Sequence, residues 1–202
     1  MIAVIDYGAG NLRSVVNAIK NLSFEPTVTD NPNDLKGAAA VILPGVGAAA
    51  DTMKGLEKTK MADAIRRLVE EGRPLLAVCV GLQVLLSATE EGGWHKCLGL
   101  VDGVVKKLPA GLKIPHIGWN QVTQKENHWI FKDIPDGTDF YFVHSYYAKP
   151  EDESVIVGTT DYGFSWCSVL ARDNLVATQF HPEKSGTYGL KMYDNFLKKA
   201  LG

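Results

Sequence analysis

A cysteine between an apolar run and a turn of small residues is the feature of the sequence with the clearest chemistry. Residues 75–78 read Leu-Leu-Ala-Val, and Cys79 follows, with Val-Gly-Leu-Gln after it. Ala77 and Gly81 are small enough for a sharp strand-to-helix turn at the cysteine. At a helix N-terminus the backbone favours a thiolate, which makes Cys79 a candidate nucleophile and the N–H of Val80 a candidate oxyanion donor.

The alternative for Cys79 taken alone is a core position, because cysteine is among the most often buried residues. Cys97 and Cys167 have no comparable setting and are expected in the core. The three cysteines form no CxxC pair, so neither a zinc site nor a disulfide framework is expected.

A histidine and a glutamate two residues apart form the second candidate cluster. Residues 179–185 read Gln-Phe-His-Pro-Glu-Lys-Ser. Pro182 favours an extended His181, which turns the Glu183 carboxylate to the same side of the chain. Glu183 could then orient one imidazole nitrogen while the other acts on a thiol. Alone, the segment could be a polar turn before a helix; together with Cys79 it predicts a nucleophile, a base and an orienting acid.

A loop with two glycines is the third signal. Residues 43–47 read Leu-Pro-Gly-Val-Gly, directly after an apolar run. Glycines let backbone N–H groups come close to a ligand, so Val46 or Gly47 could donate the second hydrogen bond of an oxyanion hole. The alternative is an ordinary tight turn between a strand and a helix.

The elements that must position these residues alternate between strands and helices. Apolar runs at 2–5, 40–43 and 75–78 predict buried strands, and residues 25–29 read as a further strand. Helical spacing predicts helices over 11–22, 53–71 (in one or two pieces) and 81–88. Such alternation indicates a parallel sheet with helices on both faces. Ligands bind beyond the carboxyl ends of such strands, so segments 7–11, 44–47 and 79–83 are expected to line one crevice.

The second half is richer in strands. Candidate strands cover 101–106, 139–143, 155–159, 165–171 and 175–180, and a last helix opens at Ser185 or Gly186. The predicted fold class is therefore α/β, with a mostly parallel central sheet flanked by helices and a more antiparallel, β-rich second half. One domain over 1–202 is expected from the length.

Composition excludes several classes of protein. The chain has 202 residues, 46% of them hydrophobic and 22% charged, and a net charge of −2. No basic run suits nucleic acid, and no apolar stretch is long enough for a membrane span or a signal peptide, so a soluble cytoplasmic protein is expected. Residues 8–10 are not a dinucleotide fingerprint, no phosphate-binding loop occurs, and His95, His116 and His128 lack ligand spacing. We therefore expect no cofactor and no metal.

On these residues the sequence resembles the class I, triad-type glutamine amidotransferases over essentially its whole length. The segments around Cys79 and His181 are the ones that indicate this class. More narrowly, the chain is similar to the glutaminase subunits of imidazole glycerol phosphate synthase through residues 6–12 (Asp-Tyr-Gly-Ala-Gly-Asn-Leu), 44–47, 116–120 (His-Ile-Gly-Trp-Asn) and 141–146 (Tyr-Phe-Val-His-Ser-Tyr). It departs from the family at Ala77, where glycine is usual.

The resemblance implies an amidase that hydrolyses glutamine to glutamate through a cysteine thioester. It assigns catalysis to Cys79, His181 and Glu183 and the oxyanion hole to Val46 and Val80. Ammonia would pass to a (β/α)8-barrel cyclase subunit, in a heterodimer that makes imidazole glycerol phosphate for histidine biosynthesis. The glutamine-binding positions that match are Gly47, Gln83, Ser145 and Tyr146. The positions that match the partner interface are Asn11, Trp119, Tyr141 and Lys184.

Other interpretations compete with this one. Ser145 and Tyr146 could be the polar end of a strand, and Trp119 could be a core residue. A glutaminase serving another synthase, such as the one that makes pyridoxal phosphate, fits less well with residues 44–47 and 118–120. A cysteine peptidase or esterase on the same sheet would rarely combine Gln83 with the His-Pro-Glu segment. A non-catalytic binding module would not need all three catalytic residues.

Overall fold

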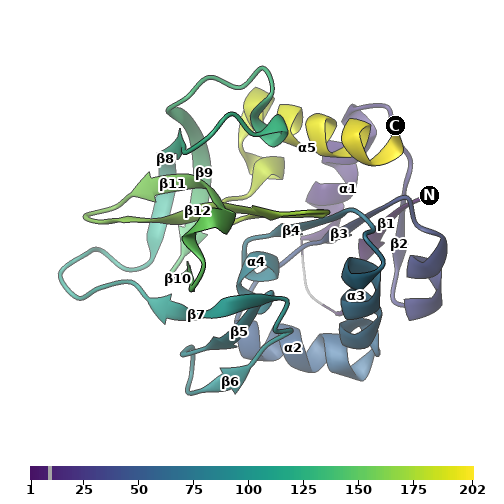
Figure 1. Ribbon diagram of the computed structural model, residues 1–202, viewed down its shortest axis with the longest axis horizontal. Helices are drawn as coiled ribbons and strands as arrows, with labels where there is room; N and C mark the ends of the chain where they lie inside the picture. Colours follow the sequence, from purple (N-terminus) through teal and green to yellow (C-terminus); the bar gives the residue numbers. More distant parts are fainter. Residues whose placement is uncertain (9–10) are drawn as a thin grey trace.

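A continuous sheet runs through the computed structural model, which describes residues 1–8 and 11–202 (Figure 1). Its first half is parallel, in the order β2-β1-β3-β4-β13. These strands are fully buried except β2, as expected for a sheet covered on both faces. Their bounds are Ile2–Ile5 for β1, Pro26–Thr29 for β2, Ala40–Leu43 for β3, Leu75–Val78 for β4 and Leu175–Thr178 for β13.

Helices cover both faces of this half, as predicted (Figure 1). Helices α1 (Leu12–Asn21) and α5 (Gly186–Leu201) lie on one face, and α2 (Ala49–Lys58) and α3 (Met61–Glu70) lie on the other. The helical stretch predicted over 53–71 is thus two helices, separated where Lys60 takes a left-handed φ of 60°. Short 3-10 turns occur at Pro32–Gly37, Trp129–Phe131, Glu153–Val155 and Pro182–Lys184.

The second half of the sheet is mainly antiparallel, which confirms the predicted fold class. From β13 the order continues β12-β10-β7-β5-β6, and a branch β12-β11-β8-β9 extends to one side. Only β5 and β7 pair in parallel in this part of the described chain. The bounds are Leu86–Thr89 for β5, His95–Lys96 for β6, Val101–Lys107 for β7, His116–Gln124 for β8, Thr138–His144 for β9, Tyr146–Pro150 for β10, Ile156–Asp161 for β11 and Ser165–Arg172 for β12.

Two predictions about elements were wrong. The helix expected over 81–88 is shorter: α4 spans Val80–Val84, and the chain then enters β5. Pairing of β5 with β6 and β7 overrides the helical spacing of its apolar residues. The strand expected over 175–180 ends at Thr178, because the residues beyond it turn toward the candidate site.

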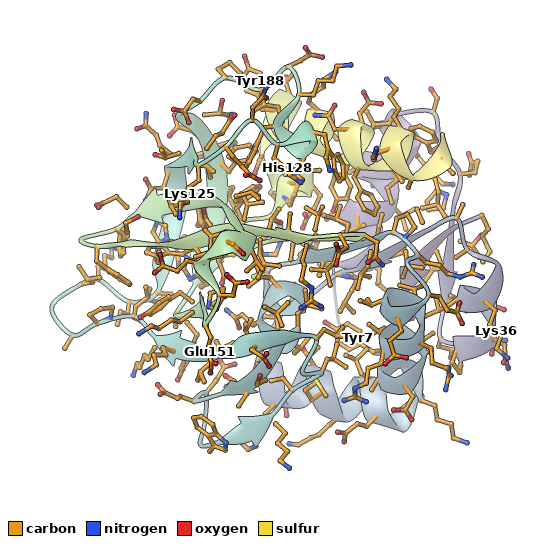
Figure 2. All side chains as sticks on the ribbon, in the orientation of Figure 1. Tyr7, Lys36, Lys125, His128, Glu151 and Tyr188 are labelled. Atoms are coloured by element: carbon orange, nitrogen blue, oxygen red, sulfur yellow. The ribbon has the colours of Figure 1, made fainter. Side chains whose placement is uncertain are left out.

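Side chains follow the expected division between core and surface. Tyr7 is buried beside the sheet, whereas Lys36, Lys125, Glu151 and Tyr188 are exposed (Figure 2). None of the helices described for the chain combines the length and the apolar character that a membrane crossing requires.

Candidate active site

Cys79 sits at a strained turn between β4 and α4. Its φ of 54° and ψ of −109° lie outside the ordinary regions for a residue with a side chain, and it caps the N-terminus of α4. The loop after β3 packs directly on this turn. A Cβ on Gly81 would lie 2.5 Å from the carbonyl oxygen of Leu43, and one on Gly45 would lie 2.8 Å from that of Val78. The glycines are therefore needed for the close approach that surrounds the cysteine.

The histidine reaches the cysteine because β13 pairs in parallel with β4. Val78 lies opposite Thr178, and the N–H of Cys79 donates to the carbonyl of Thr178 at 2.7 Å. The residues after each strand therefore emerge side by side at the same sheet edge. His181 is extended, with φ of −100° and ψ of 98°, as expected before a proline.

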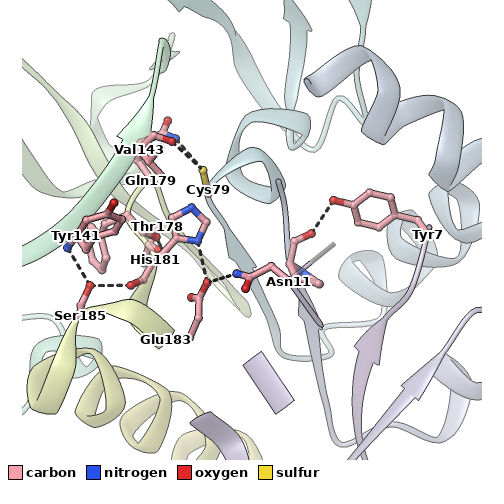
Figure 3. A network of polar contacts seen from close by, with 12 residues as sticks. Tyr7, Asn11, Cys79, Tyr141, Val143, Thr178, Gln179, His181, Glu183 and Ser185 are labelled. Atoms are coloured by element: carbon pink, nitrogen blue, oxygen red, sulfur yellow. Dashed lines mark hydrogen bonds and ion pairs between the residues drawn. The ribbon is translucent and has the colours of Figure 1, made fainter. Parts of the chain in front are cut away.

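Glu183 bonds an imidazole nitrogen of His181, as expected, but the backbone between them is not extended throughout. It lies in the 3-10 turn Pro182–Lys184, not in an extended segment. Its Oε1 is 2.8 Å from Nδ1 of His181, and the two side chains are 1% and 2% exposed. The same oxygen accepts a hydrogen bond of 2.8 Å from Nδ2 of Asn11, which has a left-handed φ of 74° (Figure 3). Asn11 thus supports the orienting carboxylate.

The environment of His181 favours its charged form. Burial acts to lower its pKa, but hydrogen bonding and charge from Cys79 and Glu183 outweigh burial and raise the pKa to about 9. An imidazolium next to a thiol is the arrangement that activates cysteine nucleophiles. Cys97 and Cys167 differ: burial raises their pKa values to about 11 and about 12, which makes them inert thiols.

The cysteine sulfur also has two neutral neighbours. Its thiol can donate to the carbonyl oxygen of Val143 in β9, at 4.0 Å. The side-chain amide nitrogen of Gln179 lies 3.7 Å from the sulfur and points toward it (Figure 3). No role was predicted for these two residues, because only the pairing of distant strands brings them to Cys79.

A cavity of about 260 Å³ opens over the sulfur and brings most of the predicted site residues together. Glu91 also lines it; its carboxylate accepts a hydrogen bond of 2.7 Å from the N–H of Ala49 at the start of α2. Nothing in its sequence context, an acidic residue before two glycines, signalled a place in this cavity. The lining residues are Val46, Gly47, Cys79, Val80, Gln83, Glu91, Val143, His144, Ser145, Tyr146, His181 and Lys184.

The expected crevice is formed by two of its three segments. Residues 44–47 and 79–83 contribute to the lining, but the described part of segment 7–11 does not. Tyr7 instead supports the glycine loop, donating from its hydroxyl to the carbonyl of Pro44 at 3.1 Å, and Asn11 acts on Glu183. Residues 9–10 lie outside the part of the chain that the structure describes.

The exposed Trp119 on β8 and the half-buried Tyr141 on β9 form an aromatic pair, and the backbone carbonyl of Tyr141 accepts from the N–H of His181. They lie opposite each other in the antiparallel register, and their rings meet edge to face at 6.1 Å. Trp119 is 56% exposed, so it is not a core residue, and Ile117 on the same face of β8 is 59% exposed. The N–H of Tyr141 is held at 2.9 Å by the hydroxyl of Ser185, directly after Lys184.

Among residues 1–8 and 11–202, no group of three or more His, Cys, Asp or Glu side chains is placed to hold a metal ion. The groups brought together here are instead the Cys79 thiol, the His181 imidazole with the Glu183 carboxylate bonded to it, and the Glu91 carboxylate in the cavity lining. This set suits covalent and acid–base chemistry.

Known proteins share both the sequence and the fold. The profile of the glutamine amidotransferase class-I family matches residues 3–200. The imidazole glycerol phosphate synthase subunit HisH of Dehalococcoides mccartyi is 60% identical over 202 residues, which cover 100% of this chain and 98% of that protein. The HisH subunit of Aquifex aeolicus is 49% identical, covering 98% of this chain and 96% of the relative.

Solved structures agree with this fold. A glutamine amidotransferase crystal structure superimposes with a TM-score of 0.79 at 20% identity, with 100% of both chains covered. The structure of PurLQS from Thermotoga maritima gives a TM-score of 0.76 at 19% identity, covering 98% of this chain and 97% of that chain. The chain belongs to the class I glutamine amidotransferases and, within them, to the family of HisH subunits of imidazole glycerol phosphate synthase.

Proposed function

We propose that this glutamine amidotransferase releases ammonia from glutamine by covalent catalysis at Cys79 and delivers it to a cyclase subunit. The observation that carries the proposal is the convergence at one cavity of a cysteine at a strained helix N-terminus and a histidine held by a buried glutamate. No other described cavity contains a cysteine together with a histidine.

The proposed reaction has two halves. His181 accepts the proton of Cys79, and the sulfur attacks the side-chain carbonyl carbon of glutamine. The C–N bond breaks as His181 returns the proton to the leaving ammonia, which leaves a γ-glutamyl thioester. A water molecule, deprotonated by His181, then attacks the thioester, and glutamate leaves as the sulfur takes back a proton. The N–H groups of Val46 and Val80 stabilise the oxyanion in both halves, at roughly 10²–10³ in rate per donor.

The cavity lining supports a zwitterionic substrate. The Glu91 carboxylate would bind the α-ammonium group of glutamine, and the Lys184 ammonium group would bind its α-carboxylate. Gly47, Ser145 and Tyr146 line the same space and are the proposed contacts to the glutamine backbone. The side-chain NH2 of Gln83 donates to the Tyr146 carbonyl and to Gln179, so the side-chain oxygen of Gln83 is the atom available to bind substrate.

The partner is proposed to be a (β/α)8-barrel cyclase that covers the face carrying Trp119 and Tyr141. An exposed tryptophan and isoleucine on one strand form the kind of apolar patch that marks a protein interface. Asn11 bonds Glu183 and Lys184 lines the cavity, so both adjoin the catalytic residues. In the heterodimer, ammonia would react with the phosphoribulosyl formimino aminoimidazole carboxamide ribonucleotide. The products would be imidazole glycerol phosphate and an aminoimidazole carboxamide ribotide, in a step of histidine biosynthesis in the cytoplasm.

The test is release of glutamate from glutamine by the wild type and by Cys79→Ala, with and without the cyclase and its ribonucleotide ligand. We expect turnover that is strongly stimulated in the complex and abolished by Cys79→Ala. Turnover that depends on Cys79 but ignores the cyclase would keep the amidase and reject the partner. No glutamate under any condition would reject the proposal and favour a binding module.

A further inference from the structure

The Gln179 side chain contacts the cysteine sulfur and has no part in the reaction above. It follows β13, is completely buried, and lies between Cys79 and Gln83. Its Nε2 is 3.7 Å from the sulfur of Cys79 (Figure 3). Its Oε1 is 3.2 Å from Nε2 of Gln83. A completely buried amide is costly unless its atoms are paired, so these contacts define what the group does.

The orientation of the Gln179 amide follows from its neighbours. The backbone carbonyl of Tyr146 can only accept, so the group of Gln83 that lies 2.9 Å from it must be the NH2. The second hydrogen of that NH2 points to Gln179, which must therefore present its oxygen there. The NH2 of Gln179 is left facing the sulfur of Cys79, as a donor.

A second chain of hydrogen bonds fixes the same carbonyl from the other side. Nδ1 of His144 lies 2.8 Å from the oxygen of Tyr146 and must carry a proton to bond it. Nε2 of His144 then accepts from Nδ1 of His116 at 2.9 Å, and Nε2 of His116 accepts from Asn120 at 3.3 Å. Burial lowers the pKa of both histidines, so each is a neutral ring with one donor and one acceptor.

The two neutral neighbours of the sulfur respond oppositely to its ionisation. The carbonyl of Val143 can bond only the S–H form, because a carbonyl accepts. The NH2 of Gln179 bonds the thiolate more strongly than the thiol, since a donor gains from a full negative charge. Ionisation therefore exchanges a long S–H contact for a charge-assisted bond, and it holds the sulfur on the Gln179 side.

We propose that Gln179 is a positioning residue that donates its side-chain amide to the Cys79 thiolate and is itself oriented by Gln83 and the Tyr146 carbonyl. The proposal rests on the proposed role of Cys79 as nucleophile. Gln83 then has two roles: it orients the Gln179 amide and it contacts the substrate. The hydrogen bonds that hold the Tyr146 carbonyl continue through His144 and His116 to Asn120, on the strand that carries Trp119. They therefore connect that strand to the groups that position the nucleophile.

The test is the pH dependence of alkylation of Cys79 by iodoacetamide, measured on its tryptic peptide by mass spectrometry. The variants are Gln179→Met, of similar length without a donor, and Gln179→Glu, whose carboxylate repels a thiolate. The control is Ser168→Ala, which removes a buried hydroxyl from the neighbouring strand and keeps the Gln179 donor. The titratable groups of the site stay unchanged in all three variants, namely Tyr7, Glu91, His144, Tyr146, His181, Glu183 and Lys184.

We expect the alkylation midpoint to move to higher pH in Gln179→Met and further in Gln179→Glu, with a rate at pH 6 lower by roughly tenfold or more. In the complex with the cyclase, kcat falls more than KM rises. Ser168→Ala retains the wild-type midpoint. An unchanged midpoint in folded Gln179→Met overturns the proposal, because a merely structural role would alter stability and leave the midpoint in place.

A measurement on the wild type covers the case in which the Gln179 variants do not fold. The side-chain amide signals of Gln179 in a ¹H–¹⁵N spectrum are expected to shift with the same pH midpoint as alkylation of Cys79. Signals that ignore that midpoint reject the proposal. Both readouts concern the sulfur itself, so they remain informative if the glutamate assay shows that the chain is no amidase.

Discussion

Nδ1 of His181 lies 2.8 Å from Oε1 of Glu183, and Nδ2 of Asn11, from the opposite end of the chain, bonds the same oxygen at 2.8 Å. The carboxylate is thereby held from two directions in a buried site. Tyr193 adds a third neighbour: burial and the charge of Glu183 raise the pKa of its phenol well above the ordinary value, so it faces the carboxylate as a neutral hydroxyl.

Replacing Glu183 by Gln is expected to lower kcat by about 10³–10⁴-fold. The amide keeps the shape but can no longer stabilise an imidazolium or fix which nitrogen of His181 carries the proton. The measurement is single-turnover glutamate formation in the complex. A residual rate near the wild type would show that the glutamate does not orient the base.

Stability is expected to fall on both sides of neutral pH, through different histidines. The pKa of His181 is raised to about 9, so its contribution is complete below the unfolded value of 6.5 and is lost as pH rises toward 9. The pKa of His144 is lowered to about 3, mainly by burial, so the unfolded chain binds its proton first and stability falls as pH drops from 6.5 toward 3.

Thermal unfolding across pH tests the two limbs separately. Glu183→Gln should flatten the alkaline limb, because it removes a partner that raises the pKa of His181. His144→Asn, which keeps a donor toward Tyr146, should flatten the acid limb. Parallel curves for the wild type and both variants would contradict these assignments.

Gly45→Ala is expected to lower the free energy of unfolding by about 2–3 kcal/mol, because its Cβ would overlap the backbone around Cys79. Gly37→Ala is the matched control: a Cβ there meets nothing within 4 Å, and its effect should stay within about 0.5 kcal/mol. Chemical denaturation measures both. Equal effects of the two substitutions would mean that the glycine loop yields easily.

Trp119→Ala is expected to weaken binding of the cyclase roughly 30-fold, the effect of a tryptophan hot spot of about 2 kcal/mol. Trp94 provides the control, since it is 65% exposed but lies just before β6, outside the β8–β9 face. Titration calorimetry with the cyclase measures both variants. A stronger effect at Trp94 would move the proposed interface to the β6 edge.

The sequence predicted the parallel half of the fold well because its strands are buried on both faces and appear as plain apolar runs. It missed β8 because that strand places Ile117 and Trp119 outward, against the usual pattern of apolar residues inside. It extended α4 too far because the residues of β5 become a strand only through pairing with β7.

The site divides in the same way. Cys79, His181 and Glu183 could be selected from the sequence because each sits in a short segment whose turn chemistry is local. Gln179, Val143 and Glu91 could not, since Val143 and Glu91 reach the cavity, and Gln179 the cysteine sulfur, only in the folded chain. Sequence motifs identify reacting groups more readily than the residues that surround them.

The pairing of β4 with β13 also links activity to folding. The thiol and its base are delivered by neighbouring strands that stand far apart along the chain, and the sheet cannot place His181 until the last strand has inserted between β4 and β12. Such a long-range contact closes slowly. During synthesis the cysteine therefore emerges long before its base, and the thiol of a nascent chain stays unactivated until the C-terminal strand and helix have docked.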